Sequence, residues 1–91
     1  MLVDELQAVL RQALSPVSLE IRDDSAAHVG HPGAKEGAHL AVTVVADCFA
    51  GKPALQRHRM VYEAAGPLLR RSIHALQINA LTPAEATAQG L

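Results

Sequence analysis

Aromatic residues are almost absent from this sequence. Among 91 residues Phe49 and Tyr62 are the only two rings and there is no tryptophan, although 49% of the residues are apolar. A hydrophobic core must therefore be built from Leu, Val, Ile and Ala. The same scarcity disfavours a surface that binds single-stranded nucleic acid by stacking bases on aromatic side chains.

Cysteine and an excess of charge are also missing. Cys48 is the only cysteine, which excludes a disulfide framework and a cysteine-rich metal site, and we expect it to be a buried small hydrophobe. The net charge of -1 argues against a general electrostatic attraction to nucleic acid but allows a local basic patch. No apolar run approaches membrane-spanning length, and Asp4 and Glu5 lie where a signal peptide would be basic. We expect a soluble cytoplasmic protein that makes no membrane contact.

Signatures of an enzyme are lacking as well. We find no nucleophile–base pair, phosphate-binding loop or dinucleotide fingerprint, so we expect no enzymatic activity. Asp23 and Asp24 are adjacent on a predicted strand and should point to opposite faces, which disfavours a catalytic pair. The string "GHPG" matches a GxxG nucleic-acid loop only formally, because it lies between two predicted strands rather than between helices.

The length predicts one domain, 1–91, with a core over about 2–80 and a short tail over 81–91. Helical spacing of apolar residues predicts a helix over 2–14, and alternation predicts a strand over 17–23. After a long loop over 24–38, the pattern predicts a strand over 39–49, a helix over 55–65 interrupted at Gly66-Pro67, and a strand over 73–79. A capping box of Thr82 and Glu85, with Pro83 between them, predicts a short, frayed C-terminal helix. The fold class is α+β in the order αββαβ, with a three-stranded mixed sheet and the helices packed on one face.

This order would bring histidines together from distant positions. The first two strands form an antiparallel hairpin, and a helical crossover makes the third parallel to the second. The loop with His28 and His31, the start of the second strand at His39 and the start of the third at His74 then share one end of the sheet. We interpret this corner as a candidate metal site that is incomplete without ligands from a partner, although solvated or hydrogen-bonded histidines are an equally good reading. His58, on the crossover helix, is expected to be a packing or capping residue.

Four arginines suggest a different kind of site. Arg57, Arg59, Arg70 and Arg71 could form a basic patch, and the alternative is a solvated helix face.

Several segments in this order resemble the BolA family: "LEIRDDS", the histidine loop, "FAGKPALQRHRMVY" and "IHALQINALTPAE". The resemblance covers roughly residues 16–85. It implies an αββαβ fold related to the class II KH domain but without its GxxG loop. It also implies a partner, a monothiol glutaredoxin with a CGFS motif, with which the chain would form a heterodimer and share a two-iron, two-sulfur (2Fe-2S) cluster.

The resemblance also assigns the ligands. The glutaredoxin cysteine and a glutathione thiol would bind one side of the cluster, and His74 in "IHAL" and His28, three residues after Ser25, would bind the other. His31 and His39 are alternates. The isolated protein would hold no cluster tightly and would be a monomer or a weak dimer. Ala26 stands where many relatives have a further histidine, Ala86 where they have an aromatic residue, and Gly66-Pro67 where many continue a plain helix.

Two other functions compete with the cluster adaptor. One is a DNA-binding transcriptional regulator, also suggested by the family resemblance, that would use the KH-like surface and the four arginines. The other is an interaction module that binds the glutaredoxin without any metal.

Overall fold

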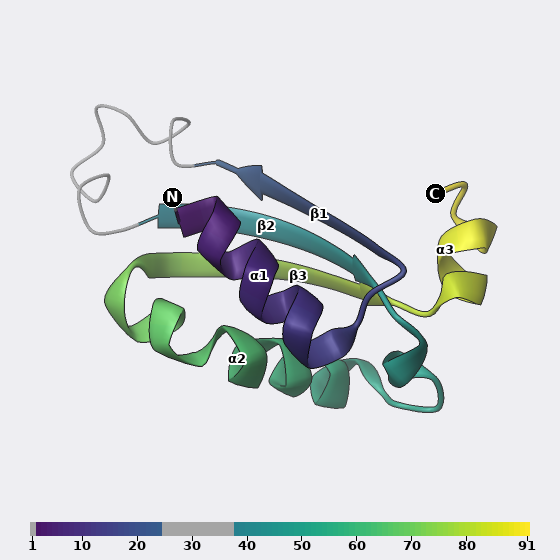
Figure 1. Ribbon diagram of the computed structural model, residues 1–91. Coiled ribbons are helices and arrows are strands. Elements are labelled where there is room, and N and C mark those ends of the chain that lie inside the picture. Colours follow the sequence, from purple (N-terminus) through teal and green to yellow (C-terminus); the bar gives the residue numbers. More distant parts are fainter. Residues whose placement is uncertain (1, 25–37) are drawn as a thin grey trace.

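The computed structural model describes residues 2–24 and 38–91 (Figure 1). In order along the chain, the elements are α1 (Leu2–Leu14), β1 (Ser18–Asp23), β2 (Ala38–Val45), the 3-10 helix η3 (Asp47–Phe49), α2 (Ala54–Arg71), β3 (Ile73–Leu81) and α3 (Pro83–Ala88). The α+β class and the αββαβ order are confirmed. No helix in the part of the chain described is both long and apolar enough to span a membrane.

The three strands form one mixed sheet in the order β1-β2-β3. β1 pairs antiparallel with β2, from Ser18 opposite Val45 to Asp23 opposite Leu40. β2 pairs parallel with β3, from Ala38 opposite Ile73 to Val45 opposite Leu81. The helical crossover thus produces the parallel pair that the sequence predicted.

The main core lies between one face of the sheet and the helices α1 and α2 (Figure 1). Aliphatic residues at helical spacing on α1 and at alternate positions on β2 meet there, as their periodicities require. The fully or nearly fully buried members are Leu6, Leu10, Leu14, Leu40, Val42, Val44, Phe49, Val61, Ala65 and Leu68. The other face of the sheet carries a small second cluster, in which Ala86 of α3 packs against Val45 and Leu81.

The structure corrects the ends of two predicted strands, since β3 continues to Leu81 rather than ending at residue 79 and β2 is shorter than expected. β2 ends at Val45 rather than at residue 49, and residues 47–49 form η3 instead. Ala46 still donates its N–H to the carbonyl of Leu81, at 2.9 Å, but the chain then turns so that Phe49 enters the core with no exposed surface. Burial of the only phenylalanine therefore prevails over the β-propensity of the segment.

The other local predictions can be compared directly. The interruption at Gly66-Pro67 is confirmed, because Gly66 leaves helical geometry (φ 6°, ψ −88°) before the helix resumes and ends at Arg71. The capping box of α3 is confirmed, with the Glu85 N–H donating to Thr82 Oγ1 at 3.2 Å and the Thr82 N–H donating to Glu85 Oε1 at 2.8 Å. Cys48 is half-buried against the core, its thiol 3.7 Å from the carbonyl of Leu14.

Candidate functional site

The strand ends expected to carry the histidines meet at one end of the sheet (Figure 1). At this end Asp24 donates its N–H to the carbonyl of His39, at 2.8 Å, and Ala38 donates to the carbonyl of Ser72, at 3.0 Å. The end of β1, the start of β2 and the start of β3 are therefore joined by backbone hydrogen bonds. This places the backbones of His39 and His74 at the same corner, as the topology predicted. His28 and His31 lie in residues 25–37, outside the described residues.

A β-bulge occurs at His74. Ala38 lies opposite Ile73, whereas the next residue of β2, His39, lies opposite Ala75. His74 is therefore an extra residue in β3 with no partner position in β2. Bulges interrupt the regular alternation of a strand and are frequent next to functional sites. Nothing in the sequence signalled this bulge, since no glycine marks it.

A charged pair lies on the strand that leads into this corner. Arg22 donates from Nε to Asp24 Oδ1, at 2.9 Å, and from Nη2 to Asp24 Oδ2, at 3.1 Å. The hydrogen bond and the charge of Asp24 raise the pKa of Arg22. Both carboxylate oxygens of Asp24 thus accept hydrogen bonds from Arg22. This contact further disfavours an acid–base role for Asp24, which the sequence already disfavoured.

Among the described side chains, those of residues 2–24, 38–73 and 75–91, no group of three or more His, Cys, Asp or Glu is arranged to hold a metal ion. The two proposed ligands, His28 and His74, lie outside these ranges.

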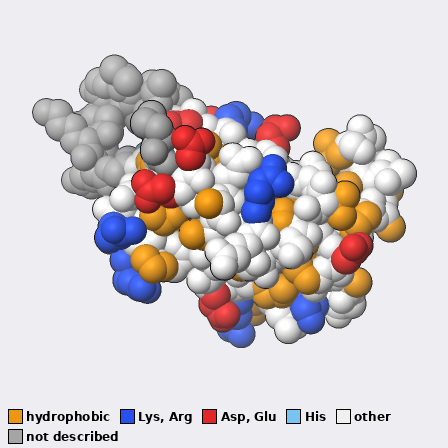
Figure 2. All heavy atoms as spheres, viewed as in Figure 1, with side chains coloured by type: hydrophobic (Ala, Val, Ile, Leu, Met, Phe, Trp, Pro, Cys, Tyr) orange, Lys and Arg blue, Asp and Glu red, His pale blue; other side chains and the backbone are white. Residues whose placement is uncertain are grey.

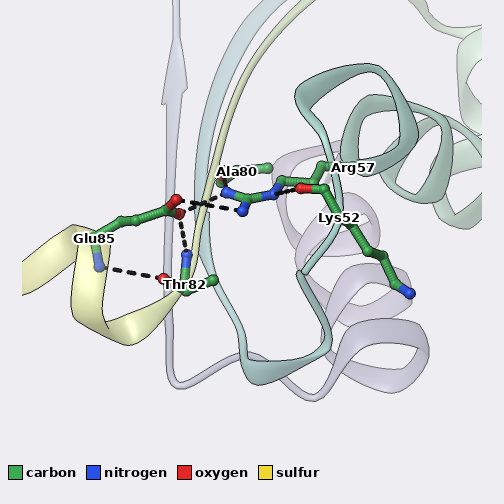
Figure 3. Close-up of polar contacts among 5 residues, drawn as sticks. All are labelled: Lys52, Arg57, Ala80, Thr82 and Glu85. Carbon is green, nitrogen blue, oxygen red and sulfur yellow. Dashed lines mark hydrogen bonds and ion pairs between the residues drawn. The ribbon is translucent and has the colours of Figure 1, made fainter. Parts of the chain in front are cut away.

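Arg57 makes a set of contacts that the sequence did not reveal (Figure 3). Its guanidinium donates to the carbonyl of Lys52, at 2.7 Å, to the carbonyl of Ala80, at 3.0 Å, and to Glu85 Oε1, at 2.6 Å. The side chain is only 13% exposed. We call Arg57, Thr82 and Glu85 the Arg57 clasp, because they tie the start of α2, the end of β3 and the start of α3 together.

The clasp also sets the charge of Glu85. The hydrogen bond from Arg57 and the one from the Thr82 backbone lower the pKa of Glu85 from 4.5 to about 2. The Thr82-to-Glu85 spacing predicted the cap, but only the tertiary structure shows that the same carboxylate also binds Arg57.

The other three candidate arginines are exposed, but they do not lie together. Arg59 is near the start of α2, while Arg70 and Arg71 are at its end. Arg59 and Arg70 are 11 positions apart, and the non-helical Gly66 lies between them. The four arginines therefore do not form one continuous patch.

His58 lies on a different part of the surface from His39 and His74. It is half-buried and, with Tyr62, borders a shallow hollow of about 570 Å³ that is also lined by residues of all three strands. The Tyr62 hydroxyl donates to the carbonyl of Leu76 at 3.4 Å.

Known proteins share this fold. A family model described as BolA-like protein matches residues 10–85. The chain belongs to the BolA-like family. The BolA-like protein 1 of Mus musculus is 45% identical over 80 residues, which are 88% of this chain and 57% of that protein. This BolA-like chain therefore spans little more than half the length of that relative.

Two further BolA proteins extend the comparison. The DNA-binding transcriptional regulator BolA of Escherichia coli is 35% identical over 82 residues, 90% of this chain and 76% of that protein. The solved BolA domain of SufE1 from Arabidopsis thaliana superposes with a TM-score of 0.79 at 40% identity, covering 90% of this chain and 92% of that chain. The BolA-like fold thus occurs both in small proteins and as a domain of a larger one.

Proposed function

We propose that this BolA-like protein is an adaptor in iron–sulfur cluster trafficking or iron sensing. It binds a monothiol CGFS glutaredoxin as a heterodimer, and the two proteins and glutathione share a 2Fe-2S cluster. His74 and His28 are the ligands on this chain, with His31 and His39 as alternates. The proposal rests on one observation: the end of β1 and the starts of β2 and β3 lie at the same corner of the sheet. Both ends of the histidine loop therefore lie beside the backbones of His39 and His74.

The chemistry of these donors suits a shared cluster. Imidazole ligates iron, and replacing two thiolates by two imidazoles raises the reduction potential of a two-iron cluster. The bulge at His74 supports the assignment because it departs from the regular pairing of the sheet at the proposed ligand. With Cys48 as the only cysteine, half-buried beside the C-terminal residue of α1, thiolate ligands at this corner would come from the partner.

The test is a titration of this protein with cluster-loaded glutaredoxin, followed by visible absorption and circular dichroism. We expect the wild type to change both spectra and the His28→Ala, His74→Ala double variant to lose the change. His58→Ala is the matched control, since it removes an imidazole from α2 and should behave as the wild type. An unaltered spectral change in the double variant contradicts the ligand assignment, and complex formation without any spectral change favours a metal-independent module.

A DNA-binding regulator is the second candidate, favoured by the name of the Escherichia coli relative. The DNA phosphates would be contacted by the exposed arginines Arg59, Arg70 and Arg71. Arg57 is not included, because its guanidinium already binds three groups within the chain. If this function holds, a salt-dependent gel shift should weaken on Arg59→Ala and persist in Arg11→Ala, a matched loss of charge on α1. The absence of any shift near physiological salt contradicts it.

The proposed adaptor acts without catalysing a reaction of its own. We assign it to the cytoplasm, since a single cysteine fits a reducing compartment.

A further inference from the structure

The two edges of the sheet differ in how they are protected. On the β3 edge, side chains from α2 bind the outward carbonyls: Tyr62 donates to Leu76, and Arg57 donates to Ala80. On the β1 edge, no described strand pairs with β1, which is the first strand in the order β1-β2-β3. Natural sheets usually cover or blunt such edges, because an open edge is a template for another strand.

The register shows which groups of β1 point outward. Asp24 donates to His39 across the β1–β2 pair, so the N–H and C=O groups of the even-numbered residues point toward β2. Those of Leu19 and Ile21 therefore point away from β2, and within residues 2–24 and 38–91 no hydrogen bond from another element reaches them.

The side chains of β1 alternate in the usual way. Glu20 and Arg22 are exposed on the outer face, while Leu19 and Ile21 are half-buried on the core side. Figure 2 shows acidic and basic side chains interleaved along the upper margin of the molecule, where β1 runs. The strand thus carries Glu20 and Arg22 on the same face, two positions apart. Asp24, to which Arg22 is hydrogen-bonded within the chain, follows on that face.

We propose that β1 pairs antiparallel with β1 of a second copy of this chain, about a two-fold axis at Ile21. In this register the Ile21 backbones of the two copies exchange both hydrogen bonds. Glu20 lies opposite Arg22 of the second copy, and Arg22 lies opposite Glu20 of the second copy. The dimer joins two three-stranded sheets into a continuous sheet.

The charges select this register over its neighbours. An axis at Glu20 or at Arg22 places like charges directly opposite each other, which is destabilising. An axis at Asp23 brings two aspartates together and leaves only a short overlap of described residues. The axis at Asp23 also places Arg22 opposite Asp24 of the second copy, but it does so beside the two facing aspartates. Of these axes, only the one at Ile21 gives two opposite-charge pairs with no like-charge pair over residues 18–24.

The interface is small. One short strand per copy covers less surface than the roughly 800 Å² per partner typical of stable complexes. The dimer is therefore weak and depends on protein concentration. Because its ion pairs are exposed, it also weakens as salt is added.

The test measures self-association of the full chain by sedimentation equilibrium, up to about 1 mM protein. We expect a monomer–dimer equilibrium at low salt, with concentration-dependent amide shifts in nuclear magnetic resonance spectra confined to residues 18–24. Glu20→Arg makes both cross-strand pairs repulsive and should raise the dissociation constant at least about tenfold. Glu63→Arg is the matched control, since it makes the same charge change on α2 and should leave the equilibrium unaltered.

Charge reversal gives the sharper result. Arg22→Glu should weaken the dimer as Glu20→Arg does, whereas the double variant Glu20→Arg, Arg22→Glu should restore it. An equimolar mixture of the two single variants should form a heterodimer, because each pair then again joins opposite charges. A chain that stays monomeric at about 1 mM, or a dimer that Glu20→Arg does not weaken, overturns the proposal. All these variants retain His28 and His74, so the cluster titration reports separately on the proposed function.

Discussion

Arg57 shows how a residue's role depends on its tertiary contacts. In the sequence it is one of four arginines on a helix, a candidate for contacting a phosphate group. In the structure it is largely buried and binds two backbone carbonyls and a carboxylate. The residues near Arg57 in the sequence could not predict these contacts, because Ala80 and Glu85 lie 23 and 28 positions away. A charged group in such surroundings is held by its partners and is less available to an external ligand.

The clasp predicts a particular dependence of stability on pH. The pKa of Glu85 is about 2 in the folded chain, below its ordinary 4.5. A carboxylate with a lowered pKa contributes stability above its unfolded pKa and loses it as the pH falls through its folded pKa. The urea midpoint of the wild type should therefore exceed that of Glu85→Gln by a constant amount above about pH 5, and the difference should shrink between about pH 4.5 and 2.

The matched control is Glu63→Gln, an exposed carboxylate on α2 outside the clasp, whose midpoint should follow that of the wild type across this range. A difference for Glu85→Gln that does not change with pH would show that the carboxylate charge contributes nothing to the clasp.

At the scale of elements, α1 is followed directly by a residue with a strained backbone conformation. Ser15 has a positive φ of 47° and donates its N–H to the carbonyl of Arg11 at 3.1 Å. This is the left-handed cap that favours glycine, because a Cβ atom is unfavourable there. Ser15→Gly should stabilise the chain by about 0.5 to 1 kcal/mol, seen as a higher melting temperature. Ser15→Ala keeps the Cβ and should give no gain; an equal gain in both variants contradicts the argument.

The elements themselves were largely predictable from local patterns. Helical spacing located α1, and alternation located β1, because each buries one face against the same core. The break at Gly66-Pro67 and the cap at Thr82 followed from residues with known backbone effects. The end of β2 was predicted wrongly, since whether a β-branched segment continues depends on where Phe49 packs.

At the scale of the whole molecule, the αββαβ order decides which strand ends meet. A hairpin followed by a helical crossover brings His39 and His74 to one end of the sheet, although they are 35 positions apart in the chain. The same topology leaves β1 and β3 as edges, and only β3 is covered by α2. The proposed cluster site and the proposed dimer edge therefore both follow from strand order.

The sequence by itself determined the fold class and the shared position of the strand ends. These depend on hydrophobic period, turn residues and connection handedness, which are local or nearly local. The family followed from the resemblance of particular segments, such as "RHRMVY" and "IHAL". Only the tertiary structure decided that His74 lies at a bulge, that Arg57 binds Lys52, Ala80 and Glu85, and that no described strand pairs with the outer edge of β1. Each of these three features depends on contacts between residues that are distant in the chain. Strand register and side-chain packing there depend on several segments at once, so no single segment predicts them.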